Sequence, residues 1–116
     1  MNLFICYPKC STCQKARNFL ENHHIKFQER DIKLDNPTGE ELKTWIEKSG
    51  LPVQKFFNTS GLLYKELNLK EKLPKMTDEE KIELLSSNGM LVKRPILITE
   101  DKVLVGFKEL DYKELL

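Results

Sequence analysis

The sequence predicts a single α/β domain built on a mixed four-stranded sheet. Three observations lead to this prediction. A strand–helix–strand pattern fills residues 1–36, helical spacing with capping motifs fills residues 37–93, and two short β-branched runs and a helical segment fill residues 94–116. A chain of 116 residues is long enough to bury one hydrophobic core, so we expect one domain over residues 1–116.

The first unit is a βαβ pattern. Residues 2–6 are an apolar run typical of a buried strand, which Pro8 ends because proline has no N–H to donate. Apolar residues then recur at spacings of three and four over residues 11–22, which predicts a helix. Residues 25–32 predict a second strand, and a crossover of this length implies that the two strands are parallel.

Residues 37–93 are predicted to be a helical insert. Capping boxes of the form Thr-x-x-Glu at residues 38–41 and 77–80 mark two helix starts. Residues 53–57 predict a short helix and residues 62–69 have helical spacing. The expected apolar faces of the two capped helices are Leu42, Trp45 and Ile46, and Ile82, Leu84 and Leu85.

The last unit is a ββα pattern. Residues 96–99 and 102–105 are β-branched runs joined by a short polar turn, which predicts a hairpin. Gly106 breaks the second run, and residues 107–116 have helical spacing. We expect Phe107, Leu110 and Leu115 to form the apolar face of this last helix. The order βαβ, insert, ββα predicts a thioredoxin-like (glutaredoxin-like) fold, with residues 1–36 and 94–116 as its sheet-forming parts.

Composition limits the function classes. Net charge is +1 with acids and bases interspersed, so we expect no direct DNA binding. Apolar runs are only a few residues long, which is too short for a bilayer span. The N-terminal residues lack the basic region and cleavage site of a signal peptide, so we expect a cytoplasmic protein. We also expect the protein to be a monomer.

Two of the three cysteines form the motif Cys-Ser-Thr-Cys at residues 10–13. An odd count excludes a simple disulfide framework, and a zinc site would need a second ligand pair that Cys6, His23 and His24 do not supply. We therefore expect no bound metal. A CxxC pair beside a βαβ pattern is typical of thiol redox proteins. The alternative is that both cysteines pack as small apolar residues.

Position divides the work between the two thiols. Cys10 falls where the first strand has ended and the helix begins, so backbone N–H groups of the first turn can stabilise its thiolate. An ordinary thiol is only about 3% ionised at pH 7, and lowering its pKa to neutrality requires about 2 kcal/mol. A helix N-terminus supplies roughly 0.3–1 kcal/mol. A cation must complete the shift, and Arg94 or Lys9 could supply it.

The remaining cysteines have other predicted roles. Cys13 lies one turn deeper on the same helix face, so it is the predicted resolving thiol and Cys10 the predicted nucleophile. Cys6 ends the apolar strand and is expected to be an inert core residue. Arg94 precedes Pro95 just before a strand, which is a common site for a cis X–Pro bond, and a cis bond could aim the guanidinium at the Cys10 sulfur. A surface arginine before an edge strand is the alternative for Arg94.

With these residues in place, the chain resembles the arsenate reductase-like (ArsC/Spx) family. The similarity runs through four stretches: YPKCSTCQKA at residues 7–16, FFNTSG at 56–61, GMLVKRPI at 89–96 and VGF at 105–107. The resemblance implies a thioredoxin-like fold with a helical insert, a reactive Cys10 and an Arg94 that contacts it. Glutaredoxin-coupled arsenate reductases of this family carry three arginines, of which only Arg94 matches here. The places of the other two fall near Asn58 and Phe107, neither of which can bind an oxyanion through a charge.

Three functions follow from the resemblance. The favoured one is a thiol–disulfide redox protein that reduces a small oxidised molecule or a protein disulfide, with no bound cofactor and with glutathione–glutaredoxin or thioredoxin as the electron donor. The second is an Spx-like redox-switched regulator that binds the RNA polymerase α-subunit, although the basic C-terminal tail of those proteins is missing here. Arsenate reduction is the least favoured.

Overall fold

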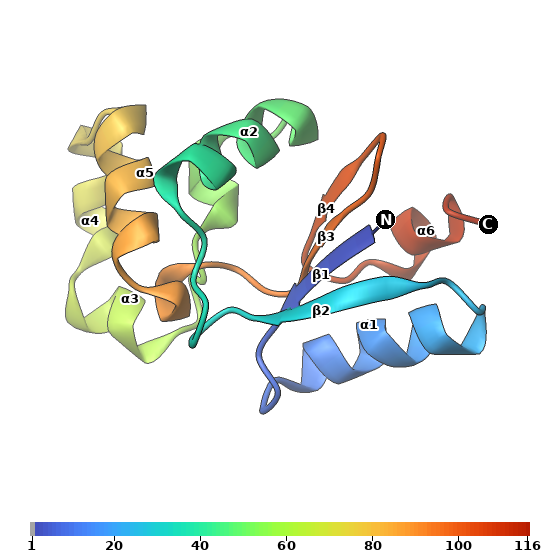
Figure 1. Cartoon of the computed structure of the whole chain (residues 1–116). Helices are drawn as coiled ribbons and strands as arrows, with labels where there is room; N and C mark the ends of the chain where they lie inside the picture. The colour runs from blue at the N-terminus through green and yellow to red at the C-terminus, as the bar shows by residue number, and fades with distance from the viewer. Residues whose placement is uncertain (1) are drawn as a thin grey trace.

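The computed structural model describes residues 2–116, and its centre is a four-stranded sheet in the order β2-β1-β3-β4 (Figure 1). β1 (Asn2–Cys6) pairs in parallel with β2 (Phe27–Asp31) and antiparallel with β3 (Ile96–Ile98). β3 pairs antiparallel with β4 (Val103–Val105). The predicted mixed sheet of the thioredoxin-like fold is confirmed.

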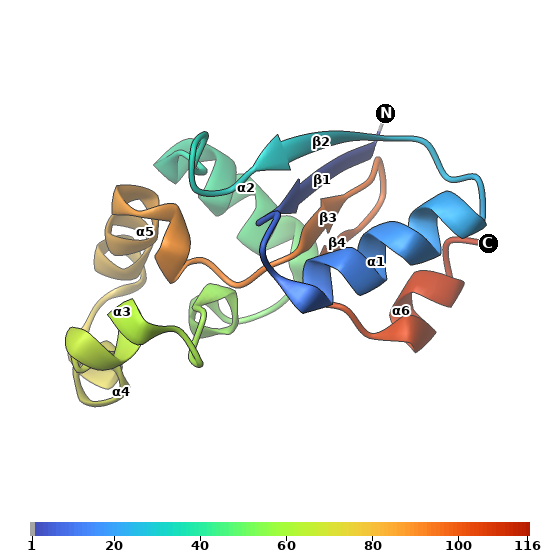
Figure 2. The ribbon, with the colours of Figure 1, turned by 90° about the horizontal axis from the view of Figure 1, so that it is seen from below.

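One face of the sheet is covered by α1 (Ser11–Asn22) and the short α6 (Glu109–Lys113), which lie side by side in Figure 2. Because side chains alternate along a strand, Phe4 and Cys6 of β1 face these helices and Ile5 faces the opposite side. The buried cluster on this face consists of Phe4, Cys6, Cys13, Ala16, Phe19, Leu20, Leu97 and Tyr112. This cluster fixes the start of α1, which carries both cysteines of the CxxC motif.

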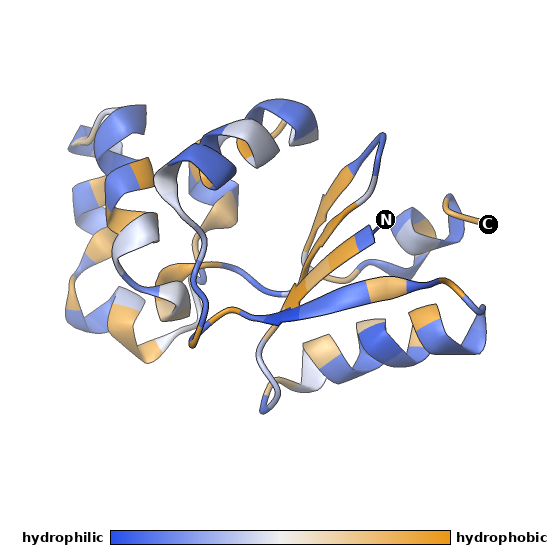
Figure 3. Cartoon of the chain, viewed as in Figure 1, coloured by the Kyte–Doolittle hydropathy of each residue, from blue (hydrophilic) through white to orange (hydrophobic). Residues whose placement is uncertain are grey.

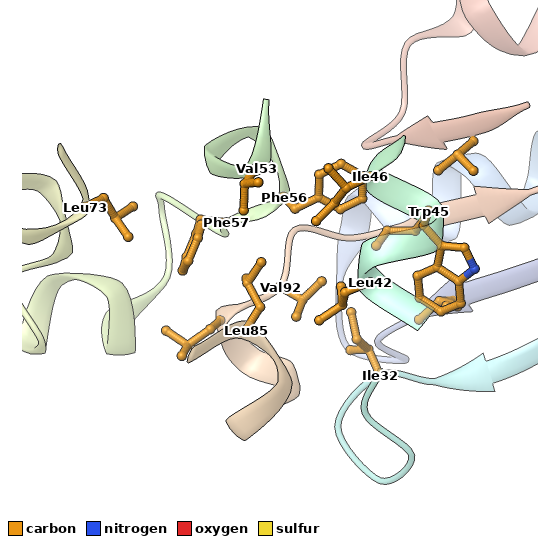
Figure 4. Close-up of a cluster of buried hydrophobic side chains, with 14 of the residues drawn as sticks. Ile32, Leu42, Trp45, Ile46, Val53, Phe56, Phe57, Leu73, Leu85 and Val92 are labelled. Carbon is orange, nitrogen blue, oxygen red and sulfur yellow. The ribbon is translucent and has the colours of Figure 1, made fainter. Parts of the chain in front are cut away.

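The opposite face packs against the helical insert. Its helices are α2 (Gly39–Ser49), α3 (Leu62–Glu66), α4 (Leu69–Lys72) and α5 (Asp78–Ser87), joined by the 3-10 helices η1 (Val53–Phe56), η2 (Leu73–Lys75) and η3 (Gly89–Leu91). Figure 4 shows the shared core, in which Trp45 and Ile46 lie towards the sheet and Phe57 and Leu85 lie deeper in the insert. Apolar residues gather in the central strands and on the inner helix faces, whereas outer faces are hydrophilic (Figure 3).

Both predicted capping boxes are confirmed. The Thr38 and Thr77 side chains each accept a hydrogen bond from the main-chain N–H three residues on, at 3.1 Å in both cases. The first capped helix ends at Gly50, whose φ of 71° is the left-handed conformation that glycine adopts without strain. Leu42, Trp45 and Ile46 are buried as predicted.

Two helix predictions are wrong in part. The segment 62–69 is not one helix, because Asn68 adopts a left-handed φ of 54° and separates α3 from α4. In the last helix, Leu110 is 77% exposed, and the residue packed onto the sheet is Tyr112. The helix is oriented by aromatic packing, since the Tyr112 ring makes edge contacts with Phe19 at 5.8 Å and Phe107 at 4.7 Å between centroids.

Candidate functional site

Cys10 lies at the N-cap of α1, with the extended backbone (φ −94°, ψ 122°) that residues at this position adopt. A tight turn after β1 holds it there, since the Cys10 N–H donates to the Tyr7 carbonyl at 3.0 Å. Its side chain is partly exposed, so a dissolved substrate can reach the sulfur.

The surroundings of Cys10 favour its thiolate. Partial burial opposes ionisation, but polar interactions outweigh it and lower the pKa of Cys10 below that of an ordinary thiol. These come from the main-chain N–H and the thiol of Cys13, the Arg94 guanidinium and the Thr12 N–H. The N–H groups at the start of α1 and the Arg94 guanidinium thus act on Cys10 in the same direction.

Cys13 has the opposite environment. Its side chain is fully buried, and burial, helped by the nearby Cys10 charge, raises the pKa of Cys13 to about 12. The Tyr7 N–H donates to the Cys13 sulfur at 3.3 Å and offsets part of that effect. Of the two sulfurs, the partly exposed Cys10 therefore ionises first and the buried Cys13 keeps its proton beneath it.

Arg94 lies beside the pair. The Arg94–Pro95 peptide bond is cis, and the guanidinium carbon lies 5.1 Å from the centroid of the Tyr7 ring. Its Nη1 is buried without a hydrogen-bond partner among the described residues. Lys9, the other cation considered from the sequence, is exposed and does not line the cavity at Cys10.

A cavity of about 340 Å³ opens beside the Cys10 sulfur. Its walls come from four segments that are distant in sequence: Cys10 and Thr12; Asn58, Ser60 and Gly61; Lys93 and Arg94; and Val105, Gly106, Phe107 and Lys108. The structure therefore brings Cys10 and Arg94 together at one cavity, with Cys13 buried behind it.

Main-chain hydrogen bonds hold these walls in register. The Asn58 N–H donates to the Leu91 carbonyl and the Lys93 N–H donates to the Phe56 carbonyl, both at 2.8 Å. On the other side, the Gly106 N–H donates to the Pro95 carbonyl at 2.8 Å. The loop that carries Arg94 is thereby fixed between two neighbours before any substrate binds.

Sequence reasoning missed two cationic side chains of this cavity, Lys93 and Lys108. Lys93 lies within the stretch GMLVKRPI, and Lys108 directly follows the Val-Gly-Phe stretch. This position in or beside the motifs was the sequence signal that could have marked the two lysines as site residues. Nothing in the sequence shows that the two lysines face the same cavity.

Cys6 stays apart from this site, as predicted. It is fully buried, and burial raises the pKa of Cys6 to about 11 although the Arg17 Nη2 donates to its sulfur at 3.3 Å. Within residues 2–116, no group of three or more His, Cys, Asp or Glu side chains is placed to hold a metal ion. The same part of the chain contains no helix with the length and apolar character needed to cross a membrane.

The sequence and the structure of this chain are both similar to those of known proteins. The ArsC family model matches residues 6–115. YusI of Bacillus subtilis (strain 168) is 54% identical over 111 residues, covering 96% of this chain and 94% of YusI. The regulatory protein MgsR of the same organism is 35% identical over 104 residues, covering 90% of this chain and 81% of MgsR. The crystal structure of an ArsC family related protein from Bacteroides fragilis superposes with a TM-score of 0.97 at 59% identity, covering 99% and 97% of the two chains.

Proposed function

Because the chain belongs to the ArsC family, we propose that it is a thiol–disulfide reductase in which Cys10 attacks and Cys13 resolves. One observation carries the proposal: two thiols three residues apart have pKa values displaced in opposite directions, the exposed one downward and the buried one upward. Such a pair separates the attacking role from the resolving role before any substrate arrives.

The reaction begins at the Cys10 thiolate, which attacks one sulfur of a substrate disulfide RSSR. A Cys10–S–SR bond forms, the substrate S–S bond breaks, and RS⁻ leaves. Cys13 then gives up its proton and attacks the Cys10 sulfur, which releases the second RS⁻. The two leaving thiolates take up that proton and one from solution. The substrate gains two electrons, and the protein is left with a Cys10–Cys13 disulfide.

A thiol reductant must return the two electrons. Glutathione with glutaredoxin, or thioredoxin, is the proposed donor class, and a reducing cytoplasm is the proposed setting. Arg94 contributes a fixed positive charge to the Cys10 thiolate throughout this cycle, since guanidinium does not deprotonate in proteins.

A purified-protein assay tests the proposal. Turnover is measured with model disulfides and with arsenate, each in the presence of glutathione–glutaredoxin and of thioredoxin. We expect turnover of disulfides and loss of it in Cys10→Ser. Turnover of arsenate alone, or full disulfide activity in Cys10→Ser, would contradict the proposal.

A second candidate function rests on the similarity to MgsR, a regulatory protein. In that case, oxidation of the same thiol pair would control the binding of a partner protein. For an Spx-like regulator, the proposed partner is the RNA polymerase α-subunit. Binding of the reduced and oxidised chain to the C-terminal domain of that subunit separates the two functions. Redox-dependent binding without disulfide turnover would favour regulation.

A further inference from the structure

The cavity at Cys10 is lined by three cationic side chains and by no carboxylate. Lys93, Arg94 and Lys108 are among its eleven lining residues, and no Asp or Glu is. The whole chain carries a net charge of only +1, so this concentration of positive charge is local and does not reflect a basic protein. A concave site lined by one sign of charge attracts ligands of the other sign.

None of these three cations is paired with a carboxylate in the described residues. Every salt bridge found within residues 2–116 involves other side chains. The buried Nη1 of Arg94 is one of two buried side-chain atoms in that part of the chain with no hydrogen-bond partner. Leaving a buried charged donor unpaired is costly, so the site is suited to a ligand that brings acceptor oxygens.

Gly106 gives the Lys93 side chain its path along the cavity wall. A Cβ built at position 106 would lie only 3.0 Å from the Lys93 Cε, and the φ of Gly106 is +77°, where side chains are disfavoured. The Lys93 stem therefore passes over a position that has no side chain. Lys108, two residues beyond Gly106, lines the same cavity.

We propose that Lys93 and Lys108 make this site selective for small disulfides whose thiol halves carry carboxylates. The inference rests on the proposed function and adds the substrate class. A cavity of about 340 Å³ has the scale of a small-molecule site, and an aliphatic thiol with one or two carboxylates fits that scale. Lysine suits this role because its ammonium on a flexible stem can follow a carboxylate on either half of the substrate.

The chemical step is the one already described, so its electrons balance within one turnover. Cys10 takes one half of the disulfide as a mixed disulfide, and Cys13 displaces it. During both steps the carboxylates stay near Lys93 and Lys108, while the leaving sulfur departs as a thiolate. The lysines therefore affect the rate with anionic substrates without joining the bond changes.

Three aliphatic disulfides of similar size test the proposal: 3,3′-dithiodipropionate (an anion at both ends), cystamine (a cation at both ends) and 2-hydroxyethyl disulfide (neutral). Single-turnover rates with excess probe are measured for the reduced full chain and for Lys93→Gln, Lys108→Gln and the double variant. The rate with each charged probe is divided by the rate with the neutral probe. Each of these ratios for a variant is then divided by the same ratio for the wild type. This division cancels differences in leaving-group reactivity between probes and any general change in Cys10 nucleophilicity.

We expect the anion-to-neutral ratio to fall about threefold in each single variant and about tenfold in the double variant, as loss of a charge contact near the surface predicts. The cation-to-neutral ratio should rise. Raising the salt to about 0.5 M should reduce the anion preference of the wild type and have less effect on the double variant. Lys113→Gln, an exposed lysine of α6 outside the cavity, is the matched control and should leave both ratios unchanged.

The proposal is overturned if the double variant keeps the wild-type anion-to-neutral ratio, or if Lys113→Gln changes it equally. Failure of the proposed function gives a different result, namely no Cys10-dependent reaction with the neutral disulfide. Thermal melts of all variants confirm that folded proteins are compared. A ratio that falls in Lys93→Gln and Lys108→Gln but not in Lys113→Gln supports the proposal.

Discussion

Cys10 and Cys13 show how far position alone can separate two identical side chains. Each unit of pKa difference corresponds to 1.36 kcal/mol between the two protonation states. At Cys10, hydrogen-bond donors from the first turn and the Arg94 charge outweigh partial burial, whereas at Cys13 burial dominates. Because the pKa of Cys10 is lowered, a larger fraction of Cys10 is thiolate at a given pH than of an ordinary thiol, and that fraction falls as the solution is acidified.

Replacing Arg94 tests the cation at the site. In Arg94→Ala the pKa of Cys10 should rise, so the rate of Cys10 alkylation at pH 6 should fall roughly threefold to tenfold. Arg94→Lys should recover part of the rate, because the charge remains, but not bidentate binding of an oxyanion. The measurement is the pH dependence of alkylation with peptide mapping, and thermal melts control for folding. Identical profiles in all three proteins would show that Arg94 is not part of the site.

The sequence was informative for residues that carry their own signal. The CxxC spacing, the Arg-Pro dipeptide and the buried strand end predicted the positions of Cys10, Arg94 and Cys6, and the structure agrees with each. Lys93 and Lys108 carry only a weak signal, their place in or beside the quoted motifs, because lysine is common on any surface and their shared cavity arises only from tertiary contacts. The chemical roles of Cys10, Cys13 and Arg94 stay predictions.

Among the helices and strands, the features that could be predicted from the sequence were those set by a few neighbouring residues. A capping box involves only four consecutive residues, so both helix starts were predictable at Thr38 and Thr77. The break at Asn68 was not, because the same apolar spacing continues through it. The buried face of α6 was not predictable either, because the burial of Tyr112 rather than Leu110 depends on contacts with the rings of Phe19 in α1 and Phe107 in the preceding loop.

Gly89, in η3 at the end of the insert, lies directly against the main chain of Ile32, which follows β2. A Cβ at this position would lie 1.8 Å from the Ile32 carbonyl oxygen, which is main chain and cannot move aside freely. We therefore expect Gly89→Ala to lower the free energy of unfolding by about 2 kcal/mol or more, the upper part of the range for overpacking. Urea denaturation measures this change.

Gly39→Ala is the matched control for Gly89→Ala. A Cβ at Gly39 would meet only the Ile82 Cγ2, at an ordinary contact distance of 3.9 Å. This change should leave stability within about 0.5 kcal/mol of wild type or raise it, because alanine is the better helix former. Equal effects of the two alanines would contradict the close packing at Gly89.

For the molecule as a whole, the division into a sheet-forming part and an insert over residues 37–93 stays a prediction. The structure does show how the two parts are joined. Arg30 of β2 donates to both carboxylate oxygens of Glu41 in α2, at 2.7 and 2.9 Å, and its guanidinium lies 5.9 Å from the Trp45 ring centroid. This bidentate pair links the sheet to the first helix of the insert.

The Arg30–Glu41 pair makes stability depend on acid pH. Hydrogen bonding to Arg30, opposed by burial and helped by the Thr38 N–H, lowers the pKa of Glu41 to about 2. A lowered pKa in the folded state means that the stabilisation is present above the ordinary value of 4.5 and is lost as pH falls towards 2. Glu41→Gln should therefore reduce the free energy of unfolding by about 1 kcal/mol at pH 7, a value kept small because the carboxylate is partly exposed.

The pH dependence provides the control for Glu41→Gln. The difference between variant and wild type should shrink between pH 4.5 and about 2, where the wild-type carboxylate is itself neutralised. Chemical denaturation at several pH values measures it. A difference that stays constant down to pH 2 would show that the loss does not come from the carboxylate charge, because the bonds from Arg30 and from the Thr38 N–H both favour the ionised form of Glu41.

The division of labour between Cys10 and Cys13 is tested most directly by intact mass after one addition of a small disulfide to the reduced chain. Wild type should release both thiol halves and gain no mass from the probe, with peptide mapping showing a Cys10–Cys13 disulfide. Cys13→Ser should instead retain one thiol half on Cys10, and Cys10→Ser should remain almost unmodified. A probe adduct on Cys13, a wild-type disulfide that includes Cys6, or a Cys13→Ser protein that resolves as fast as wild type would contradict the account.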